Sequence, residues 1–517
     1  MPQPLRHLLR LLAILRILAR HDALFPFERL PLPRFVWRLL QLFGGRRSRR
    51  SSRQRPGQRL AAALHELGPS FIKLGQALSV RADLVGEALA GDLGALRDRL
   101  PPFAAAAARS TIESELGRPI EQLFSRFEDQ PVAAASIAQV HFATTPDAVE
   151  VAVKVLRPGI EAAFQRDLAL LFWLARLAER LEPSLRRLRP VDVVRTLSDS
   201  VAIEMDLRME AAAASELAAN FAADPGFRVP AVDWPRTGRR VLTLQRVDGI
   251  PIDDRQSLIE AGHDVKEIAA IVIRTFLNQA LRDGFFHADM HHGNLFVAAD
   301  CTLVAVDFGI MGRIDLPTRR FMAELLHAFL IGDWQRAAEV HFEAGYVPPG
   351  KSVAQFAQAC RSIGEPILGR AVNEISIGRL LAQLFQITAT FDMQTQPQLL
   401  LLQKTMVTAE GVARSLDPEV NFWAVAEQPV SDWLTANMAP EALLARAAAD
   451  AFKLGRRLPQ LAARFEAALT RTLDQGLRLD PESLRILAEA QARQRQPLLW
   501  AIAAIAALLL LLWWQHG

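Results

Sequence analysis

The stretch His287–Gly309 reads HADMHHGNLFVAADCTLVAVDFG, and the rest of the chain is organised around it. Two short apolar runs, Leu295–Ala298 and Thr302–Val306, are separated by a short turn. Such a pattern predicts a β-hairpin. The hairpin would bring Asp307 back beside Asn294.

Three polar side chains frame this hairpin. Asn294 follows Asp289 by five residues, and Asp307 follows Asn294 by thirteen. Carboxylate and amide oxygens are the hard ligands that hold Mg²⁺ against nucleotide phosphates. The order H-x-D-x-x-x-x-N followed by D-F-G is that of the catalytic and metal loops of protein kinases. The spacing therefore predicts phosphoryl transfer, with Asp289 as the catalytic residue and Asn294 and Asp307 as the Mg²⁺ ligands.

The histidines of this stretch offer a weaker alternative, a zinc site formed by His287, His291 and His292. No cysteine or fourth ligand stands at metal spacing, so magnesium is favoured. We expect His287 to be a structural histidine. Ala288 stands where many protein kinases have arginine, so a phosphorylated activation segment could not be gripped there.

A second hairpin is predicted upstream from Ser136–Ala143 and Val149–Leu156. The sequence VAVK ends at Lys154, where a kinase places the lysine that binds phosphate. The preceding loop is rich in alanine instead of glycine, and alanine disfavours positive φ. The predicted nucleotide-binding residues are Ala133, Ala134, Ala135, Ser136, Ile137, Ala138, Gln139, Val140, His141, Lys154 and Glu210.

The segment Asp192–Phe221 has the pattern of one long helix. It carries Glu204, Asp206 and Glu210, and the last two would share a face because they are four residues apart. An acid from this helix is needed to pair with Lys154. A solvated acidic face is the alternative.

Helical patterns resume at Leu316–Leu330 and continue to about residue 496, with breaks expected at Pro348–Gly350 and Gln428–Val430. Almost no activation segment remains between Gly309 and Leu316, and no Ala-Pro-Glu motif lies in that stretch. A protein substrate would therefore have little to dock against.

The segment Leu60–Phe103 contains a dense polar cluster within an apolar helical pattern. Gly68-Pro69-Ser70 is expected to end one helix and begin another. The cluster consists of Lys73, Gln76, Ser79, Arg81 and Asp83. A lysine on a helix is usually solvated, but this density favours a functional role.

The composition of the 517 residues is compatible with a large folded core, since 50% are hydrophobic and 22% are charged. Cys301 and Cys360 imply no disulfide framework and suit a reducing compartment. The linker Gly44–Gly57 is basic and favours a solvated loop or contact with anionic lipid. It lacks interleaved aromatic residues, so nucleic acid is not an expected partner.

Both ends of the chain suggest membrane contact. Pro497–Trp514 holds 18 residues without a charge, which predicts a transmembrane helix. Arg493 and Arg495 precede it, so the main body would be cytoplasmic. Leu5–Arg20 predicts an amphipathic helix that lies on a membrane surface or packs on the protein body.

These motifs together resemble the UbiB family, atypical kinase-like proteins of ubiquinone biosynthesis. Lys73–Gln76 matches its K-x-G-Q motif, and Glu204–Asp206 matches its E-x-D motif. Ala133–His141 matches its alanine-rich loop. Met290 and His292 depart from the family pattern HADPHPGN, in which both are proline.

The resemblance implies that Lys73 lies over the cleft and contacts Glu204 and Asp206, forming a regulatory set with Gln76. It implies that Lys154 pairs with Glu210. It also implies ATP and Mg²⁺ as cofactors, and ATPase activity or small-molecule phosphotransfer. Membrane lipids, quinone precursors and other ubiquinone-biosynthesis proteins are the implied partners.

The sequence therefore predicts an α+β, two-lobed protein-kinase-like fold with an N-terminal helical extension, a helix-rich C-terminal part and a C-terminal transmembrane helix. The predicted segments are 1–43 (amphipathic and basic helices), 44–57 (linker), 58–128 (helical extension), 129–250 (N-lobe), 251–475 (C-lobe), 476–496 (juxtamembrane helix) and 497–514 (transmembrane helix).

The predicted function is that of a membrane-anchored ATP-binding atypical kinase or ATPase that supports ubiquinone biosynthesis. A nucleotide-binding pseudokinase scaffold is the alternative. The alanine-rich loop favours the scaffold, whereas Asp289, Asn294 and Asp307 favour the enzyme. A protein kinase is a third interpretation, weakened by the missing docking segment.

Overall fold

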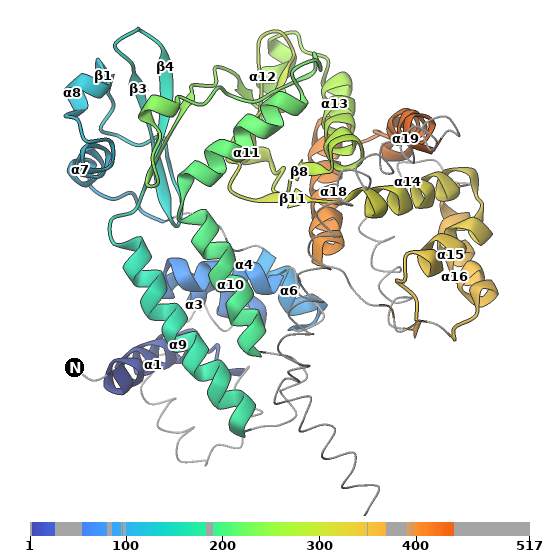
Figure 1. The fold of residues 1–517 in the computed structure, drawn as a ribbon, viewed down its shortest axis with the longest axis horizontal. Coiled ribbons are helices and arrows are strands. Elements are labelled where there is room, and N and C mark those ends of the chain that lie inside the picture. The colour runs from blue at the N-terminus through green and yellow to red at the C-terminus, as the bar shows by residue number, and fades with distance from the viewer. Residues whose placement is uncertain are drawn as a thin grey trace, which may run out of the picture. The chain divides into compact units, whose positions relative to one another are not determined.

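The computed structural model describes residues 3–25, 54–79, 85–94, 96, 100–181, 190–348, 350–368, 390–391, 393 and 397–438. The chain divides into a unit of residues 1–435 and a second unit of residues 436–517. Only the start of the second unit is described. The described residues form a two-lobed α+β fold with a helix-rich C-terminal part (Figure 1).

An antiparallel sheet forms the N-lobe. Strand β4 (Glu150–Leu156) lies between β3 (Ala138–Thr144) and β6 (Val241–Gln245). Strand β3 also pairs with the two-residue strands β1 (Arg126–Phe127) and β2 (Ala133–Ala134). The hairpin predicted around Lys154 is confirmed.

The alternation of side chains along β4 gives its two faces different roles. Successive residues of a strand point to opposite faces. The valines of β4 are buried against α7 (Ala105–Leu116) and α8 (Ile120–Leu123), so Lys154 lies on the other face. The valines are Val151, Val153 and Val155.

The hairpin predicted after Asn294 is also confirmed. Strands β9 (Leu295–Val297) and β10 (Leu303–Ala305) are antiparallel. Strand β5 (Phe227–Arg228) pairs with β10, and β7 (Ile250–Pro251) pairs with β9. The sheet has the order β5-β10-β9-β7.

The structure also contains a two-stranded sheet that was not predicted from the sequence. One of its strands precedes the β9–β10 hairpin in the chain and the other follows it. Strand β8 (Phe285–His287) is antiparallel to β11 (Met311–Arg313). The pairing places the start of the catalytic loop beside the residues that follow Asp307-Phe308-Gly309.

Helices make up most of the C-lobe, as predicted. Helix α13 illustrates why they form: Asp264 caps its first backbone N–H groups, and its apolar stripe is buried against α18. The helical segments of the C-lobe are α12 (Arg255–Glu260), α13 (Val265–Leu277), η5 (Asn278–Asp283), η6 (His292–Asn294), α14 (Leu316–Ile331), α15 (Trp334–Glu343), α16 (Val353–Leu368), α18 (Pro397–Leu416) and α19 (Phe422–Met438), whereas η4 (Trp234–Arg236) lies beside β6 of the N-lobe.

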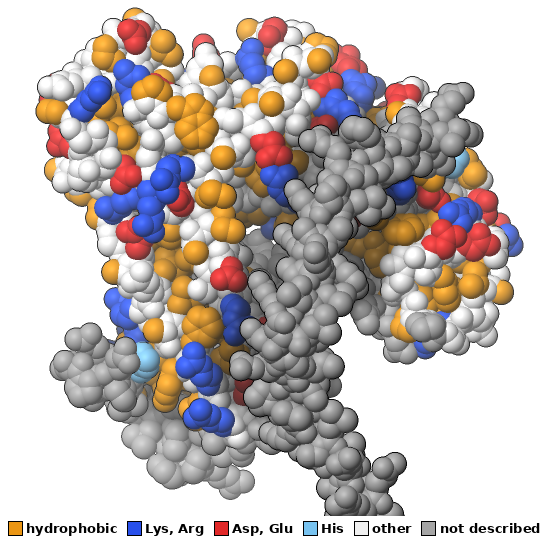
Figure 2. Space-filling view, in the orientation of Figure 1, with side chains coloured by type: hydrophobic (Ala, Val, Ile, Leu, Met, Phe, Trp, Pro, Cys, Tyr) orange, Lys and Arg blue, Asp and Glu red, His pale blue; other side chains and the backbone are white. Residues whose placement is uncertain are grey.

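Ion pairs fasten the surface of this helical region. Arg336 of α15 pairs with Glu324 of α14, and its Nη1 lies 2.7 Å from Glu343 Oε1. Acidic and basic side chains lie together around α15 in Figure 2. Exposed pairs of this kind contribute little to stability.

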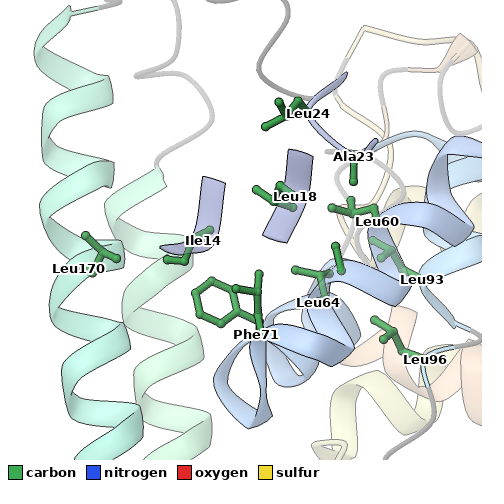
Figure 3. Packing of buried hydrophobic residues seen from close by; sticks show 12 residues of the cluster. Ile14, Leu18, Ala23, Leu24, Leu60, Leu64, Phe71, Leu93, Leu96 and Leu170 are labelled. Carbon is green, nitrogen blue, oxygen red and sulfur yellow. The ribbon is translucent and has the colours of Figure 1, made fainter. Parts of the chain in front are cut away.

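The N-terminal helices pack around a core of their own (Figure 3). Ile14 and Leu18 of α1 are buried with Leu64, Phe71 and Leu170, which come from three other helices. The helices of this core are α1 (Gln3–Arg20), α3 (Pro56–Leu67), α4 (Pro69–Ser79), α6 (Glu87–Gly94) and α9 (Ile160–Leu181). Helix α10 (Pro190–Glu204) packs along α9, and α11 (Leu207–Asn220) packs against β6 of the N-lobe.

Helix α1 is also tied to the body through charge. Arg10 Nε lies 2.9 Å from Oδ1 of Asp167, a carboxylate that is 3% exposed. Its guanidinium also lies over the ring of Phe71. Of the two alternatives for this amphipathic helix, the structure shows packing on the body.

Three predictions about helix boundaries are wrong. The segment Asp192–Phe221 is two helices, α10 and α11, because Asp206 adopts an extended backbone and caps α11. Gln428–Val430 is no break, since α19 continues through Pro429. Residues 56 and 57, assigned to the basic linker, are the first residues of α3.

The predicted juxtamembrane helix 476–496 and transmembrane segment 497–514 lie outside the described residues. Among the helices that the structure describes, none has the length and apolar character required to cross a bilayer.

Gly312 of β11 tests the packing of the small sheet. A Cβ at this position would lie 2.1 Å from Cζ of Phe286, which is fully buried. Gly312→Ala should lower the free energy of unfolding by about 2 kcal/mol through overpacking. Gly411→Ala is the matched control, because in the described part of the chain only atoms of its chain neighbours and of its own helix backbone lie within 4 Å of the added Cβ on α18. That change should stabilise the helix by up to about 1 kcal/mol. Chemical denaturation measures both; equal effects of the two substitutions would contradict the packing.

Candidate functional site

The catalytic-loop stretch begins with a histidine that serves the backbone. His287 is fully buried; its Nε2 lies 3.1 Å from Val306 O, and its Nδ1 accepts the N–H of Asp289 at 3.1 Å. Burial lowers the pKa of His287, so the ring is neutral and Nε2 donates. Both ring nitrogens are therefore occupied within the chain, as expected of a structural histidine.

Hydrogen bonds to two backbone carbonyls bring the three predicted catalytic and metal residues together. Asn294 Nδ2 donates to the carbonyl of Asp289 at 3.0 Å. The N–H of Val306 donates to the carbonyl of Asn294 at 2.9 Å, at the base of the β9–β10 hairpin. Asp307 follows in a left-handed conformation with φ of 62°. A non-glycine residue in this region is uncommon and is typical of functional sites.

Lys154 joins the two lobes at the site. Its Nζ lies 2.8 and 3.0 Å from the two carboxylate oxygens of Glu210 and 2.8 Å from Asp307 Oδ1. The Lys154 and Glu210 side chains are 15% and 7% exposed, whereas the Asp307 side chain is 50% exposed. The pairing of Lys154 with Glu210 thus exists in the structure.

The charges of this cluster perturb one another. Burial raises the pKa of Glu210 to about 7, and Asp307 adds to that effect while Lys154 opposes it. Partial loss of hydration alone would also raise the pKa of Asp307, whose side chain stays half exposed, but the nearby ammonium of Lys154 holds that pKa below its usual range. For Lys154 the two carboxylates outweigh burial and raise its pKa. Asp307 is therefore ionised at neutral pH and can bind a cation.

Lys73 approaches this cluster from the N-terminal extension. Its Nζ lies 2.7 Å from Glu204 Oε2, and both side chains are largely buried. The charge of Lys73 also lowers the pKa of Asp307. Asp206 caps α11 and binds the guanidinium of Arg208 through both oxygens.

The other members of the predicted polar cluster are placed only in part. Gln76 is half-buried on α4, and its carbonyl accepts the hydroxyl of Ser79 at 2.7 Å. Arg81 and Asp83 lie outside the described residues.

The alanine-rich loop is a short turn between β2 and β3. The N–H of Ala135 donates to Ala138 O at 2.8 Å. None of residues 133–138 has a positive φ, so the turn does not require glycine. Ser136 is fully buried, and among the residues that the structure describes its hydroxyl has no hydrogen-bond partner.

Two residues, Arg157 and Gln139, support this loop through hydrogen bonds, and the sequence patterns did not predict that role for either. Arg157 Nη2 donates to Ala135 O at 2.8 Å and to Pro101 O at 2.9 Å. Gln139 was predicted as a nucleotide ligand, but its buried amide bonds both backbone groups of Phe103. No local pattern marks such a brace; the only signal is an arginine three residues beyond Lys154.

The remaining predicted nucleotide-binding residues have different environments. Ile137 and Ala138 are buried in an apolar cluster that includes Leu156. His141 is fully buried, and its ring nitrogens contact Glu128 O and Gln139 Nε2 at 2.8 Å each. It therefore supports the sheet.

Magnesium suits the donor set better than zinc does. The carboxylate of Asp307 and the amide of Asn294 are hard oxygen ligands. The zinc alternative is not supported by the geometry: His287 is internally bonded, and His292 Nε2 lies 3.0 Å from Ser415 Oγ. In the described part of the chain, no three His, Cys, Asp or Glu side chains cluster as metal ligands would.

Lys154→Met tests the electrostatic role of the lysine. The substitution keeps an unbranched side chain, one atom shorter, but removes the ammonium that Glu210 and Asp307 share. Removing one partner of a buried ion pair should lower the free energy of unfolding by about 3 kcal/mol. Arg195→Met is the control, because Arg195 and Asp192 are 61% and 53% exposed; its effect should stay below about 1 kcal/mol. Urea unfolding without nucleotide measures both, and similar losses would contradict the assignment.

The chain is similar to known proteins over most of its length. Residues 95–341 match the ABC1 atypical kinase-like domain, and residues 360–421 match the UbiB helical domain. A solved structure titled as the complex of Rv3197 with erythromycin, from Mycobacterium tuberculosis, covers 71% of this chain and 93% of that chain, at 24% identity and a TM-score of 0.49.

Bacterial relatives named "Probable protein kinase UbiB" are more similar. The protein of Marinobacter nauticus is 42% identical over 429 residues, which cover 82% of this chain and 78% of that protein. The protein of Xanthomonas euvesicatoria pv. vesicatoria is 41% identical over 470 residues, or 88% and 83% of the two chains. The protein of Azotobacter vinelandii is 42% identical over 400 residues, or 77% and 74%. By this similarity, the chain belongs to the UbiB family of atypical kinase-like proteins.

Proposed function

We propose that this protein is an Mg²⁺-dependent ATPase or small-molecule phosphotransferase of ubiquinone biosynthesis. The observation that carries the proposal is the shared ion cluster. Lys154 is held by Glu210 and contacts Asp307, while the side-chain amide of Asn294 donates to the backbone carbonyl of Asp289. This is the constellation that positions a triphosphate and its metal.

Each residue of the cluster has a proposed role. Lys154 grips the α- and β-phosphates, and Glu210 orients it. Asp307 and Asn294 hold Mg²⁺, whose charge would neutralise the phosphate oxygens. Asp289 orients the attacking hydroxyl or water. Lys73, Gln76, Glu204 and Asp206 form the proposed regulatory set.

A small acceptor or water is favoured over a protein substrate. Only six residues separate Gly309 from α14, and three of them form β11. Protein kinases use a longer activation segment to dock a peptide. The position before Asp289 is alanine, which cannot hold a phosphorylated residue. These features support ATP hydrolysis or transfer to a small molecule.

The proposed location is the bacterial inner membrane, with the kinase-like body in the cytoplasm. The apolar stretch 497–514 and the arginines before it support a single C-terminal anchor. Such an anchor would keep the site close to lipid-soluble quinone precursors, which the protein would act on or extract. Other ubiquinone-biosynthesis proteins are the proposed partners.

The enzymatic proposal is tested by ATP hydrolysis of the purified full-length protein with Mg²⁺ and anionic vesicles. Asp307→Asn should reduce turnover at least about 100-fold, because it removes a charged metal ligand. Asp300→Asn, at the exposed tip of the β9–β10 hairpin, is the matched control and should retain wild-type turnover. Wild-type turnover no higher than that of Asp307→Asn would refute the enzymatic proposal.

Complementation separates the enzyme from the pseudokinase scaffold. In a strain that lacks the native protein, Asp289→Asn should fail to restore ubiquinone if catalysis is required. Restoration equal to that by the wild type would favour the scaffold. Mass spectrometry of the accumulated quinone precursors supplies the readout.

A further inference from the structure

Helix α18 contacts the catalytic loop at Ala288, the residue that stands in place of the kinase arginine. Ala288 is buried; its N–H donates to Ile310 O at 3.0 Å, just after Asp307-Phe308-Gly309. Its carbonyl oxygen lies 3.1 Å from Oγ1 of Thr405, which is fully buried. The peptide groups of Ala288 therefore join the metal loop to α18.

The hydroxyl of Thr405 has one proton and two carbonyl acceptors. Besides Ala288 O, it lies 2.9 Å from Leu401 O, one helical turn earlier. Threonine hydroxyls in helices often bond to the carbonyl one turn back. The additional contact with Ala288, 117 residues away in sequence, is what distinguishes Thr405.

A second bond from α18 reaches the other side of Asp289. The hydroxyl of Ser415 donates to Val412 O at 2.7 Å, so its oxygen accepts the N–H of His292 Nε2 at 3.0 Å. His292 is also a departure from the family pattern, in which this position is proline. The loop segment 288–292 is thus held at both ends by the same helix.

Helix α18 is itself held in place by buried apolar contacts and by a hydrogen bond from α12. Its buried face includes Ala409, Val412 and Leu416, all without exposed surface, and it packs along α13. Arg255 of α12 donates to Leu416 O at 2.8 Å. A helix fixed in this way can hold the catalytic loop in one place.

We propose that Thr405 is a positioning residue for Asp289, and that α18 fixes the catalytic loop from the C-terminal helical region. An activation segment fixes this loop in many protein kinases, and here that segment is nearly absent. The catalytic part of this inference rests on the proposed function; the structural part does not. It implies that displacement of α18 would loosen the backbone around Asp289.

Three substitutions in the full-length protein test the proposal. Thr405→Val keeps the shape of the side chain and removes the hydroxyl, so the buried carbonyl of Ala288 loses its partner. Thr405→Ser restores a hydroxyl. Thr408→Val is the matched control, because Thr408 is only partly buried and makes the same bond to the preceding turn, with Lys404 O, where that bond is exposed to solvent.

Two readouts are expected to agree. With Mg²⁺-ATP, Thr405→Val should lower kcat about tenfold with little change in KM, because a small displacement of Asp289 affects the reacting geometry. Thr405→Ser and Thr408→Val should stay near wild type. Amide exchange of peptides covering residues 286–294, measured by mass spectrometry, should accelerate in Thr405→Val alone.

ATP hydrolysis and amide exchange together distinguish failure of the positioning role from failure of the proposed function. If the wild type hydrolyses ATP and Thr405→Val matches it, the positioning role is refuted. Equal losses in Thr405→Val and Thr408→Val would show a general helix effect and would also refute it. If the wild type shows no hydrolysis, the proposed function fails, and the exchange measurement alone decides: unchanged exchange in Thr405→Val would overturn the contact between α18 and the loop.

Discussion

The site depends on one ammonium group held between two carboxylates. Lys154, Glu210 and Asp307 come from a strand, a helix and a hairpin end that lie far apart in sequence. Bringing three charges out of water is unfavourable unless they compensate one another. When Glu210 is ionised, one lysine cannot neutralise both carboxylates, and the cluster carries surplus negative charge. Asp307, the exposed member, is where a divalent cation would balance that charge before a triphosphate approaches.

Local patterns in the sequence predicted the two hairpins that deliver these groups. In each hairpin, apolar alternation and a turn signal agree, and both pairings exist. The break between α10 and α11 was missed because the helical periodicity continues across it. Aspartate is a favoured N-cap residue, and the side chain of Asp206 accepts a hydrogen bond from Arg208 N. A new helix therefore begins here and the preceding one does not continue. The break has a consequence for the site: Glu204 binds Lys73, while Glu210, on the next helix, binds Lys154.

Other features could not be read from the sequence because they join residues distant in the chain. From the sequence, the alanine-rich loop seemed poorly suited to binding phosphate, since a flexible glycine loop can approach phosphate more closely. The structure shows a different solution. The turn adopts ordinary backbone angles, and Arg157 and Gln139 fasten it to the segment that leads in from the N-terminal extension. Such a loop is fixed in advance, so binding a nucleotide would require less ordering of the backbone.

The N-terminal extension and α18 therefore both reach the kinase-like site. The N-terminal extension supplies Lys73, which forms an ion pair beside the metal loop, and α18 supplies the hydroxyl that meets Ala288. These contacts explain how a very short segment after Asp307-Phe308-Gly309 can suffice. Strand β11 returns the chain at once to β8, so the two loops of the site are joined through backbone hydrogen bonds. The N-terminal extension and α18 of the C-lobe would thus give the catalytic loop the support that a long activation segment gives elsewhere.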